Sequence, residues 1–320
     1  MKPTHFLPLM LAVSGLALAQ QNQDFSKVEV HVLPVQGNVY MLVGAGGNIT
    51  VQVGKDGVFM VDTMYAPLAE KVVAAIRTIS SGPIRYIVNT HVHEDHTGGN
   101  EPLRKAGSTI TGGNVSADIR DSAEGAQIIA HQNILNRMSA KGPDSRPSAA
   151  WPTDTYVGDE KDFFFNGEGI QVIHLPNAHT DGDSIVFFRK SDVISTGDLF
   201  TTTNYPVIDV ERGGTINGFI AALQKIVDMI IPVYGQEGGT MVVPGHGRLC
   251  DLGDVIEYRE MTIIVRDRIQ DMVNKGMTLE QVKAAKPTID YDTLYGQSTF
   301  WGTDRFVEAV YKTLKKQDTK

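Results

Sequence analysis

Residues 91–96 read His-Val-His-Glu-Asp-His, and four of these six side chains can bind a metal ion: His91, His93, Asp95 and His96. The segment follows Ile84–Val88, an apolar run with the length of a buried strand. Side chains two positions apart point to the same side of an extended chain, so the first two histidines can share one ion. The aspartate and the third histidine come where the chain turns and can serve a second ion. The sequence therefore predicts a site for two ions at the end of this strand.

Two glycines, Gly98 and Gly99, follow the segment, and we expect them to permit a tight turn that brings the four side chains together. Two histidines do not complete a catalytic metal site, because a catalytic zinc usually has three protein ligands and one open position. The sequence supplies further candidates in three similar settings: His179, Asp198 and His246. Each of them follows an apolar run typical of a strand and lies near glycine, where functional loops gather.

The remaining pattern predicts two groups of strands, each accompanied by helices. Alternation at period two begins at residues 28–32 and continues through short runs to residue 63. Helices are expected at residues 67–80, 116–124, 132–138, 215–230, 255–275, 279–285 and 303–315. Residues 141–159, rich in proline and polar side chains, are expected to form a loop. This order predicts an α/β (α+β) protein with two mixed sheets packed face to face and helices outside.

The first residues have the pattern of an export signal. Lys2 precedes an apolar stretch at residues 6–18, and Ala17-Leu18-Ala19 has the small-residue spacing of a cleavage site. The stretch is too short to cross a bilayer comfortably, with an uncleaved anchor as the alternative. We therefore expect a signal peptide at residues 1–19 and a periplasmic or secreted protein that does not bind the membrane after cleavage.

The composition argues against several classes of protein. Of the 320 residues, 42% are hydrophobic and 21% are charged, which is typical of a globular domain. The net charge of -8 and the lack of a long basic run argue against a nucleic-acid partner or an anionic membrane. Because Cys250 is the sole cysteine, the chain has no internal disulfide. We expect its thiol to be a small buried group, neither nucleophile nor ligand.

Four motifs occur along the chain: H-x-H-x-D-H at 91–96, A-H-T-D-G-D at 178–183, T-G-D-L-F at 196–200 and P-G-H-G at 244–247. In this order they resemble the metallo-beta-lactamase superfamily of hydrolases, over about residues 28 to 250. The resemblance implies a four-layer αββα sandwich with a two-metal site at one edge of the sheets. It places the catalytic domain at residues 20–250, followed by a helical C-terminal extension at 251–320.

The same resemblance implies a role for each candidate ligand. Three residues would bind the first ion and three the second: His91, His93 and His179, then Asp95, His96 and His246. Asp198 would bridge the two ions, as the matching aspartate does in glyoxalase-II-like members. Asp62 matches an aspartate that supports the histidine loop, with a plain turn residue at the end of a strand as the alternative.

Nitrogen and carboxylate ligands without thiolate fit zinc best, with iron or manganese as alternatives. Two such ions about 3.5–4 Å apart can hold a hydroxide between them, and a metal lowers the pKa of water from about 15.7 to roughly 7. We therefore expect a hydrolase with two zinc ions that cleaves an ester, thioester, lactone or amide bond of a small-molecule substrate. Asp95 and Asp198 are the expected catalytic residues, and no serine or cysteine nucleophile is needed.

The substrate stays open at this stage. A thiolate-using beta-lactamase would have cysteine in place of Asp198 and a basic residue soon after, but residues 199–203 contain neither Lys nor Arg. Export to the periplasm argues the other way and keeps a beta-lactamase as an alternative. A glutathione thioesterase would have a basic C-terminal site, whereas this tail is mixed in charge. The layout, including the tail from Asp304 to Tyr311, resembles exported, cyclase-like or quinoprotein-associated members of the superfamily.

Two other classes of function remain as alternatives, an iron-dependent persulfide dioxygenase-like oxidoreductase and a binding module with a structural metal. Four residues are candidates to shape a substrate pocket, with ordinary packing or a helix cap as the alternative: Tyr65, His131, Trp151 and Tyr156. We expect the tail to pack through three residues at helical spacing, Phe306, Val310 and Leu314.

Overall fold

The computed structural model describes residues 24–109, 125–230 and 239–317, and its strands form two mixed sheets. The first sheet has the order β1-β2-β3-β4-β5-β6-β7 and the second the order β12-β11-β10-β9-β8. In the first sheet β1 to β4 pair antiparallel and β4 to β7 pair parallel. In the second sheet β8 to β11 pair antiparallel, and β11 pairs with β12 in parallel.

The bounds of the elements are as follows. The first sheet contains β1 His31–Gln36, β2 Val39–Val43, β3 Ile49–Gly54, β4 Gly57–Val61, β5 Ile84–Val88, β6 Gln127–His131 and β7 Asp154–Tyr156. The second sheet contains β8 Glu160–Phe165, β9 Glu168–His174, β10 Ser184–Phe188, β11 Val193–Ser195 and β12 Met241–Val243. The helices are α2 Ala69–Arg77, α3 Glu94–Thr97, α4 Asn100–Ala106, α6 Gln132–Ser139, α7 Ile216–Met229, α8 Leu252–Asn274, α9 Leu279–Ala284, α10 Asp292–Tyr295 and α11 Thr303–Gln317. Short 3-10 turns are η1 Phe25–Lys27, η2 Ala66–Leu68, η4 Ser148–Ala150, η5 Gly197–Leu199 and η6 Val210–Arg212.

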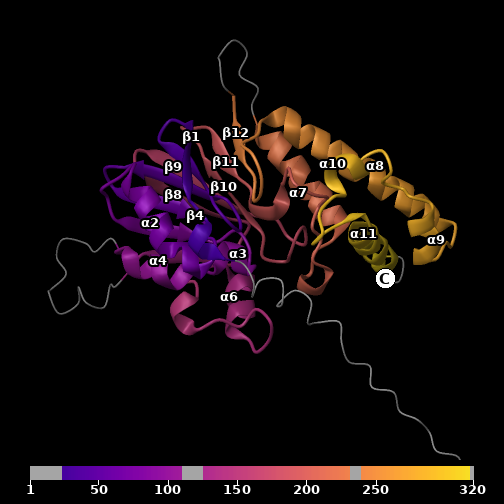
Figure 1. Cartoon of the computed structure of the whole chain (residues 1–320), viewed down its shortest axis with the longest axis horizontal. Helices are drawn as coiled ribbons and strands as arrows, with labels where there is room; N and C mark the ends of the chain where they lie inside the picture. Colours follow the sequence, from indigo (N-terminus) through magenta and orange to yellow (C-terminus); the bar gives the residue numbers. More distant parts are fainter. Residues whose placement is uncertain (1–23, 110–124, 231–238, 318–320) are drawn as a thin grey trace, which may run out of the picture.

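The two sheets pack face to face, with helices on the outer face of each sheet (Figure 1). Strand β4 shows why the sheet is covered on both faces, because the five residues of this strand are all buried. Phe59 and Val61 belong to the core between the sheets, whereas Val58 and Met60 pack with Val72 of α2 on the outer face. Alternate side chains of a strand point to opposite faces, so a continuous apolar run is buried on both sides. The predicted four-layer αββα sandwich is confirmed.

The C-terminal helices share one hydrophobic core with the outer face of the second sheet. This core contains Ile185 of β10 and Phe219 of α7 together with Phe306, Val310 and Leu314 of α11. The expected packing of the tail through these last three residues is therefore confirmed, since each is at most 1% exposed. The division of the chain into domains at residue 250 stays a prediction.

Two expectations from the sequence need correction, and three short elements were missed. The first strand covers His31–Gln36 and not residues 28–32, because it pairs with β2 at the sheet edge, where Pro34 is tolerated without its N–H. The supposed loop at 141–159 contains η4 and the three-residue strand β7. The short helices α3, α4 and α10 were not expected.

Two expectations fall outside the residues that the structure describes. They are the export signal at residues 1–19 and the helix at residues 116–124. Among the described residues, no helix is both long enough and apolar enough to span a bilayer.

Candidate metal centre

The structure brings all seven predicted ligands together at one edge of the two sheets, although they come from loops far apart in the sequence. They form two groups whose ligand atoms lie within 4.8 Å of one another: His91, His93, His179 and Asp198, then Asp95, His96 and His246. Each loop follows a strand end, and α3 carries Asp95 and His96. Because parallel neighbours such as β11 and β12 end at the same edge, their loops converge there.

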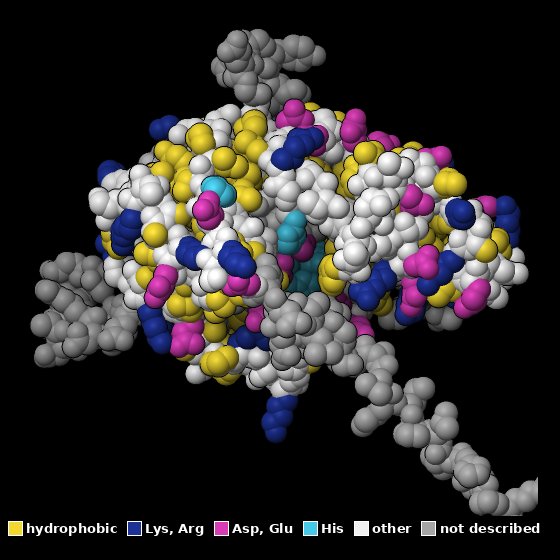
Figure 2. All heavy atoms as spheres, viewed as in Figure 1, with side chains coloured by type: hydrophobic (Ala, Val, Ile, Leu, Met, Phe, Trp, Pro, Cys, Tyr) yellow, Lys and Arg dark blue, Asp and Glu magenta, His cyan; other side chains and the backbone are white. Residues whose placement is uncertain are grey.

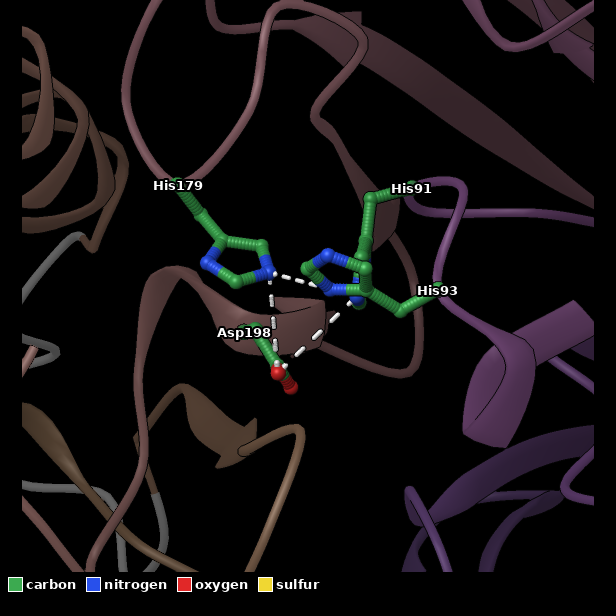
Figure 3. A group of neighbouring side chains, drawn as sticks. All are labelled: His91, His93, His179 and Asp198. Carbon is green, nitrogen blue, oxygen red and sulfur yellow. Dashed lines mark hydrogen bonds and ion pairs between the residues drawn. The ribbon is translucent and has the colours of Figure 1, made fainter. Parts of the chain in front are cut away.

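In the first group, three imidazoles and a carboxylate face a common centre (Figure 3). His179 Nε2 lies 2.9 Å from His93 Nδ1. Asp198 Oδ2 lies 3.8 Å from His91 Nε2 and 3.8 Å from His179 Nε2. These four side chains point inward from three separate loops, so the arrangement has the donor set of a metal site with an open position.

The second group lies on the other side of Asp198. His96 Nε2 and His246 Nε2 are 3.3 Å apart. Asp198 Oδ1 lies 3.1 Å from the first of these nitrogens and 3.3 Å from the second, and Asp95 Oδ2 lies 3.3 Å from His246 Nε2. Thus one oxygen of Asp198 faces each group, which is the geometry that a bridging carboxylate requires.

The outward nitrogens of four imidazoles have hydrogen-bond acceptors. His179 Nδ1 lies 2.6 Å from the carbonyl oxygen of Val207, His93 Nε2 lies 3.0 Å from Asp209 Oδ2, and His91 Nδ1 lies 3.0 Å from Thr90 Oγ1. The fourth, His96 Nδ1, lies 2.8 Å from Asp62 Oδ2. An acceptor outside holds the proton on the outward nitrogen, so the lone pair of the inward nitrogen faces the centre.

Asp62 connects two of these imidazoles. Its carboxylate accepts hydrogen bonds from Thr90 N at 2.8 Å and from Thr90 Oγ1 at 2.7 Å, besides the contact with His96. Asp62 is 1% exposed and has a φ of 65°, a left-handed conformation that costs energy in most residues. The expectation that Asp62 supports the histidine loop matches this geometry.

The ligand atoms are better suited to binding cations than to bonding with one another, because acceptors face acceptors. His93 Nδ1 and His179 Nε2 face each other at 2.9 Å, although the outward hydrogen bonds make both of them acceptors. His91 Nε2 is buried and forms no hydrogen bond with the described residues. Buried polar atoms without partners are costly, and metal ions would supply the missing partner for each. The residues present therefore fit a pair of metal ions.

The charges differ between the two groups. Burial lowers the pKa of His91 well below its ordinary value and that of His179 to about 4, so both imidazoles are neutral. Burial opposes charge on His96 and His246 too, but the nearby carboxylates, with Asp198 foremost, raise the pKa of His96 well above its ordinary value and that of His246 to about 10. In the metal-free chain the first group is therefore ready for a cation, whereas the second must release protons to bind one.

Glycines next to the site allow the close approach of other groups. A Cβ on Gly98 would lie 2.6 Å from the carbonyl oxygen of Glu94, and one on Gly99 would lie 2.3 Å from that of Thr63. Both glycines have negative φ, at -59° and -79°. The expected tight turn lies between α3 and α4, and the two glycines permit it by leaving space between backbones, without a left-handed conformation.

Three contributors to the site were missed in the sequence: Thr90, Val207 and Asp209. Thr90 is adjacent to His91 and could have been suspected from that position. Asp209 lies 116 positions from His93, and Val207 acts through its carbonyl oxygen, so no local pattern signals either of them.

The four candidate pocket residues are placed differently. Tyr156 belongs to β7, is 7% exposed, and its hydroxyl lies 2.7 Å from Ser184 Oγ, so it is part of the core. Trp151 packs beside a cluster that includes Val92, and its Nε1 donates to the carbonyl oxygen of Arg146 at 2.8 Å.

Tyr65 and His131 complete this set. The ring centroid of Tyr65 lies 5.3 Å from the ring centroid of Phe25. His131 is the N-cap of α6, as one alternative had it, and stacks on His174 at 3.7 Å. Cys250 is buried, 2% exposed, and burial raises the pKa of its thiol to about 12, in agreement with the inert role expected for it.

The centre is reached through a hollow in the surface. Histidine side chains are visible at its base in Figure 2, between the strand-rich half of the molecule and the C-terminal helices. His246, His93 and Asp95 are the more accessible members, at 28%, 23% and 22% exposed side chain, whereas His91, His96 and His179 are at most 1% exposed. A ligand entering the hollow therefore meets members of both groups.

Comparison with known proteins identifies the family. The model of the metallo-beta-lactamase superfamily matches residues 34–246. The chain is 24% identical over 293 residues to a linear primary-alkylsulfatase of Pseudomonas sp. (strain ATCC 19151), covering 80% of this chain and 53% of that protein. It is 26% identical over 144 residues to a hydroxyacylglutathione hydrolase of Pelagibacter ubique, covering 45% of this chain and 46% of that protein. The chain thus spans about half the length of the curated relatives that it matches.

Solved structures show the same fold. A stereoselective inverting sec-alkylsulfatase from Pseudomonas sp. matches with a TM-score of 0.63 at 16% identity, covering 88% of this chain and 50% of that one. A metallo-beta-lactamase from Pontibacter korlensis matches with a TM-score of 0.55 at 16% identity, covering 73% of this chain and 99% of that one. Because the family model alone covers well over half of the sequence, the chain belongs to the metallo-beta-lactamase superfamily.

Proposed function

We propose that this chain is an exported hydrolase that binds two metal ions, zinc by preference, and cleaves an ester, thioester, lactone or amide bond of a small molecule. The observation that carries the proposal is the pair of facing donor groups with Asp198 between them. The N-terminal pattern of Lys2, the apolar stretch and Ala17-Leu18-Ala19 supports export.

The candidate ligands would bind the two ions in two groups. His91, His93 and His179 would hold one ion, Asp95, His96 and His246 the other, and Asp198 would bind both. When bound, such a pair lowers the pKa of water to roughly 7 and polarises the bond to be cleaved.

Asp95 is suited to orient the attacking water, because its Oδ2 lies beside His246 and it remains 22% exposed toward the hollow. Burial opposes charge on Asp95, but His96 and His246 lower its pKa, so this carboxylate can accept a hydrogen bond from water at neutral pH. His91 and His179 are buried, and the outward hydrogen bonds hold the imidazoles of the first group in position.

A sulfate ester is a second candidate substrate. Two alkylsulfatases match this chain, one by sequence over 80% of it and one by structure over 88%. The structural match to the alkylsulfatase covers 88% of this chain, whereas the structural match to the beta-lactamase covers 73%. This broader coverage favours sulfate esters over beta-lactams as the second candidate.

The test combines metal analysis with a hydrolysis screen. The full chain is exported from a host cell, purified, and analysed for zinc, iron and manganese. It is then assayed against nitrocefin, lactones, thioesters, phosphodiesters and alkyl sulfates, beside the variant His179→Asn and the control His31→Asn, which changes an exposed histidine of β1.

The proposal expects two zinc ions per chain and hydrolysis of at least one class of substrate. The change at His179 should lower kcat/KM by at least about 100-fold, the upper range for residues that act on a metal only indirectly. The change at His31 should have no effect. One iron per chain with oxygen uptake would instead support an oxidoreductase, and tightly bound metal without any turnover would support a binding module.

A further inference from the structure

Residues 204–209, which we call the strap, run past the outside of the first metal-binding group. The far end of the strap, residues 207–209, contacts two histidines of this group. The carbonyl oxygen of Val207 lies 2.6 Å from His179 Nδ1, and Asp209 Oδ2 lies 3.0 Å from His93 Nε2. The backbone of Asp209 also donates to the carbonyl oxygen of His179 at 3.0 Å. The orientation of both imidazoles therefore depends on where the strap lies.

The near end of the strap is bonded to the C-terminal extension. Trp301 Nε1 donates to the carbonyl oxygen of Pro206 at 2.8 Å. The backbone N–H of Tyr205 donates to the carbonyl oxygen of Tyr295 at 3.3 Å. The hydroxyl of Tyr258 in α8 donates to the carbonyl oxygen of residue 204 at 3.0 Å. Three consecutive strap residues thus have a partner in residues 251–320.

Tyr205 is the anchor of this end. It is fully buried, and its ring stacks on Phe306 of α11 with centroids 4.6 Å apart and planes 7° apart. Its hydroxyl donates to Asp292 Oδ1 at 2.9 Å and lies 3.2 Å from the carbonyl oxygen of Thr288. A buried tyrosine with its hydroxyl satisfied keeps one position, because leaving that position would strand a polar group.

The two ends of the strap are close in the chain. The carbonyl that Trp301 holds belongs to Pro206, and the next carbonyl, that of Val207, holds His179. The two carbonyls belong to adjacent peptide planes that share the Cα of Val207, so a displacement of the backbone at Pro206 is passed to Val207 within one residue. The C-terminal helices flank the hollow from the side opposite the strand-rich half (Figures 1 and 2).

We propose that the C-terminal extension is part of the metal centre: through Tyr205 and Trp301 it holds the strap in place and so fixes the inward orientation of His179 and His93. Both aromatic residues act as positioning residues, and neither touches the substrate or the ions. The family model ends at residue 246, so this support comes from outside the region shared with the family. The inference rests on the proposed function, because it concerns the binding of the first ion.

The test uses three variants of the full chain that keep the bulk of the core. Trp301→Phe and Tyr205→Phe each keep an aromatic ring and lose the hydrogen-bond donor that acts at the strap. The control Tyr311→Phe loses a comparable bond inside the extension, from the hydroxyl to the carbonyl oxygen of Met277 at 3.0 Å, away from the strap. Three quantities are measured: zinc affinity by competition with a chromogenic chelator, the absorption spectrum of the cobalt(II) form, and urea unfolding of the metal-free protein.

We expect the three variants to lose similar amounts of stability, since each loses one hydrogen bond. The two strap variants alone should bind one of the two ions more weakly, by about three- to tenfold, below the 10–100-fold loss typical of a direct partner of a metal ligand. Their cobalt spectra should shift, and the double variant should lose more affinity than either single variant. Trp301 is partly exposed, so its variant serves as the test if Tyr205→Phe fails to fold.

Unchanged zinc affinity and cobalt spectrum in both strap variants would overturn the inference. The same would follow if Tyr311→Phe weakened zinc binding as much as they do, because the effect would then be one of general stability. A wild-type chain that bound no zinc would overturn the proposed function itself, before any variant was compared.

Discussion

At the scale of single residues, an unfavourable backbone conformation occurs where the candidate ligands need support. Asp62 has a positive φ and is buried, yet it accepts three hydrogen bonds that reach His96 and, through Thr90, His91. Residues in strained conformations persist when their surroundings determine them, and they cluster at functional sites. The role of Asp62 therefore lies in its charge and its position together.

The change Asp62→Asn separates these two properties. Asparagine tolerates a positive φ, so the backbone should be kept, but its N–H2 group would face the hydroxyl of Thr90 or the Nδ1 of His96. We expect zinc affinity to fall by about 10–100-fold, as for other outer partners of metal-binding histidines. Competition with a chelator measures this affinity.

The matched control is Asp192→Asn. Asp192 also has a positive φ, at 54°, and accepts a hydrogen bond from Thr240 Oγ1 at 2.7 Å, away from the donor groups. Equal zinc affinities of the two variants would show that the charge of Asp62 has no part in metal binding.

Cys250 provides a second prediction at this scale. Burial raises the pKa of its thiol to about 12, so the thiolate, which is the reactive form, is scarce at pH 8. We expect the folded protein to resist iodoacetamide at pH 8 while the urea-unfolded protein reacts fully. Mass spectrometry after timed labelling measures both, and rapid alkylation of the folded protein would refute the buried, protonated thiol.

At the scale of the elements, the predictability of each segment follows from its pattern. Strand β5 and helix α7 were predicted almost to the residue, because an apolar run or an apolar period is a local signal. Strand β7 was missed because Asp154-Thr155-Tyr156 has no apolar run, and it forms only by pairing with β6. Short helices such as α3 were missed for a similar reason, since backbone N–H groups from distant loops hold its carbonyls: Gly47, between β2 and β3, binds that of Asp95, and Thr63, after β4, binds that of His96.

Helix α6 carries a pH-dependent cap. His131 accepts a hydrogen bond from the N–H of Asn133 through Nδ1, which requires a neutral imidazole. Burial, with a smaller contribution from the stacked His174, lowers the pKa of His131 to about 4. Between pH 6.5 and 4 the unfolded chain therefore binds more protons here than the folded chain, so stability falls as the pH falls through this window.

The variant His131→Asn tests this assignment. Asparagine is a good N-cap and does not titrate in the window, so the fall in unfolding free energy from pH 6.5 to 4 should be smaller than in the wild type. Urea titrations at several pH values measure it, with His31→Asn as the control. Parallel curves for His131→Asn and wild type would contradict the shifted pKa.

Helix α8 begins the C-terminal extension with a capping box. The Asp251 side chain accepts hydrogen bonds from the backbone of Gly253 and Asp254, and the Asp254 side chain accepts one from the backbone of Asp251. We expect Asp251→Ala to lower the free energy of unfolding by about 0.5–2 kcal/mol, the usual effect of losing an N-cap. The control Asp267→Ala removes an exposed ion pair with Arg266, which contributes little. Urea unfolding that ranks the two variants equally would contradict the importance of the cap.

At the scale of the whole molecule, the candidate site is where four loops meet at one edge of two sheets. The seven candidate ligands that the structure brings together could be predicted, because they lie in short motifs whose order matches a superfamily with this arrangement. The outer partners could not be predicted: Asp209 meets His93 across 116 positions, and Trp301 reaches the strap across 95. Such contacts exist only once the sheets have packed and the extension has closed over the second sheet.

The most direct measurement for this account is anomalous diffraction at the zinc absorption edge from crystals of the full chain grown with zinc. We expect two peaks, each at about 2.0–2.2 Å from its histidine nitrogens, with Asp198 oxygens between them. One peak should lie among His91, His93 and His179, and the other beside His96 and His246. A zinc ion located elsewhere, or a map without peaks at these five histidines, would contradict the claim that the loops converge to bind a pair of metal ions.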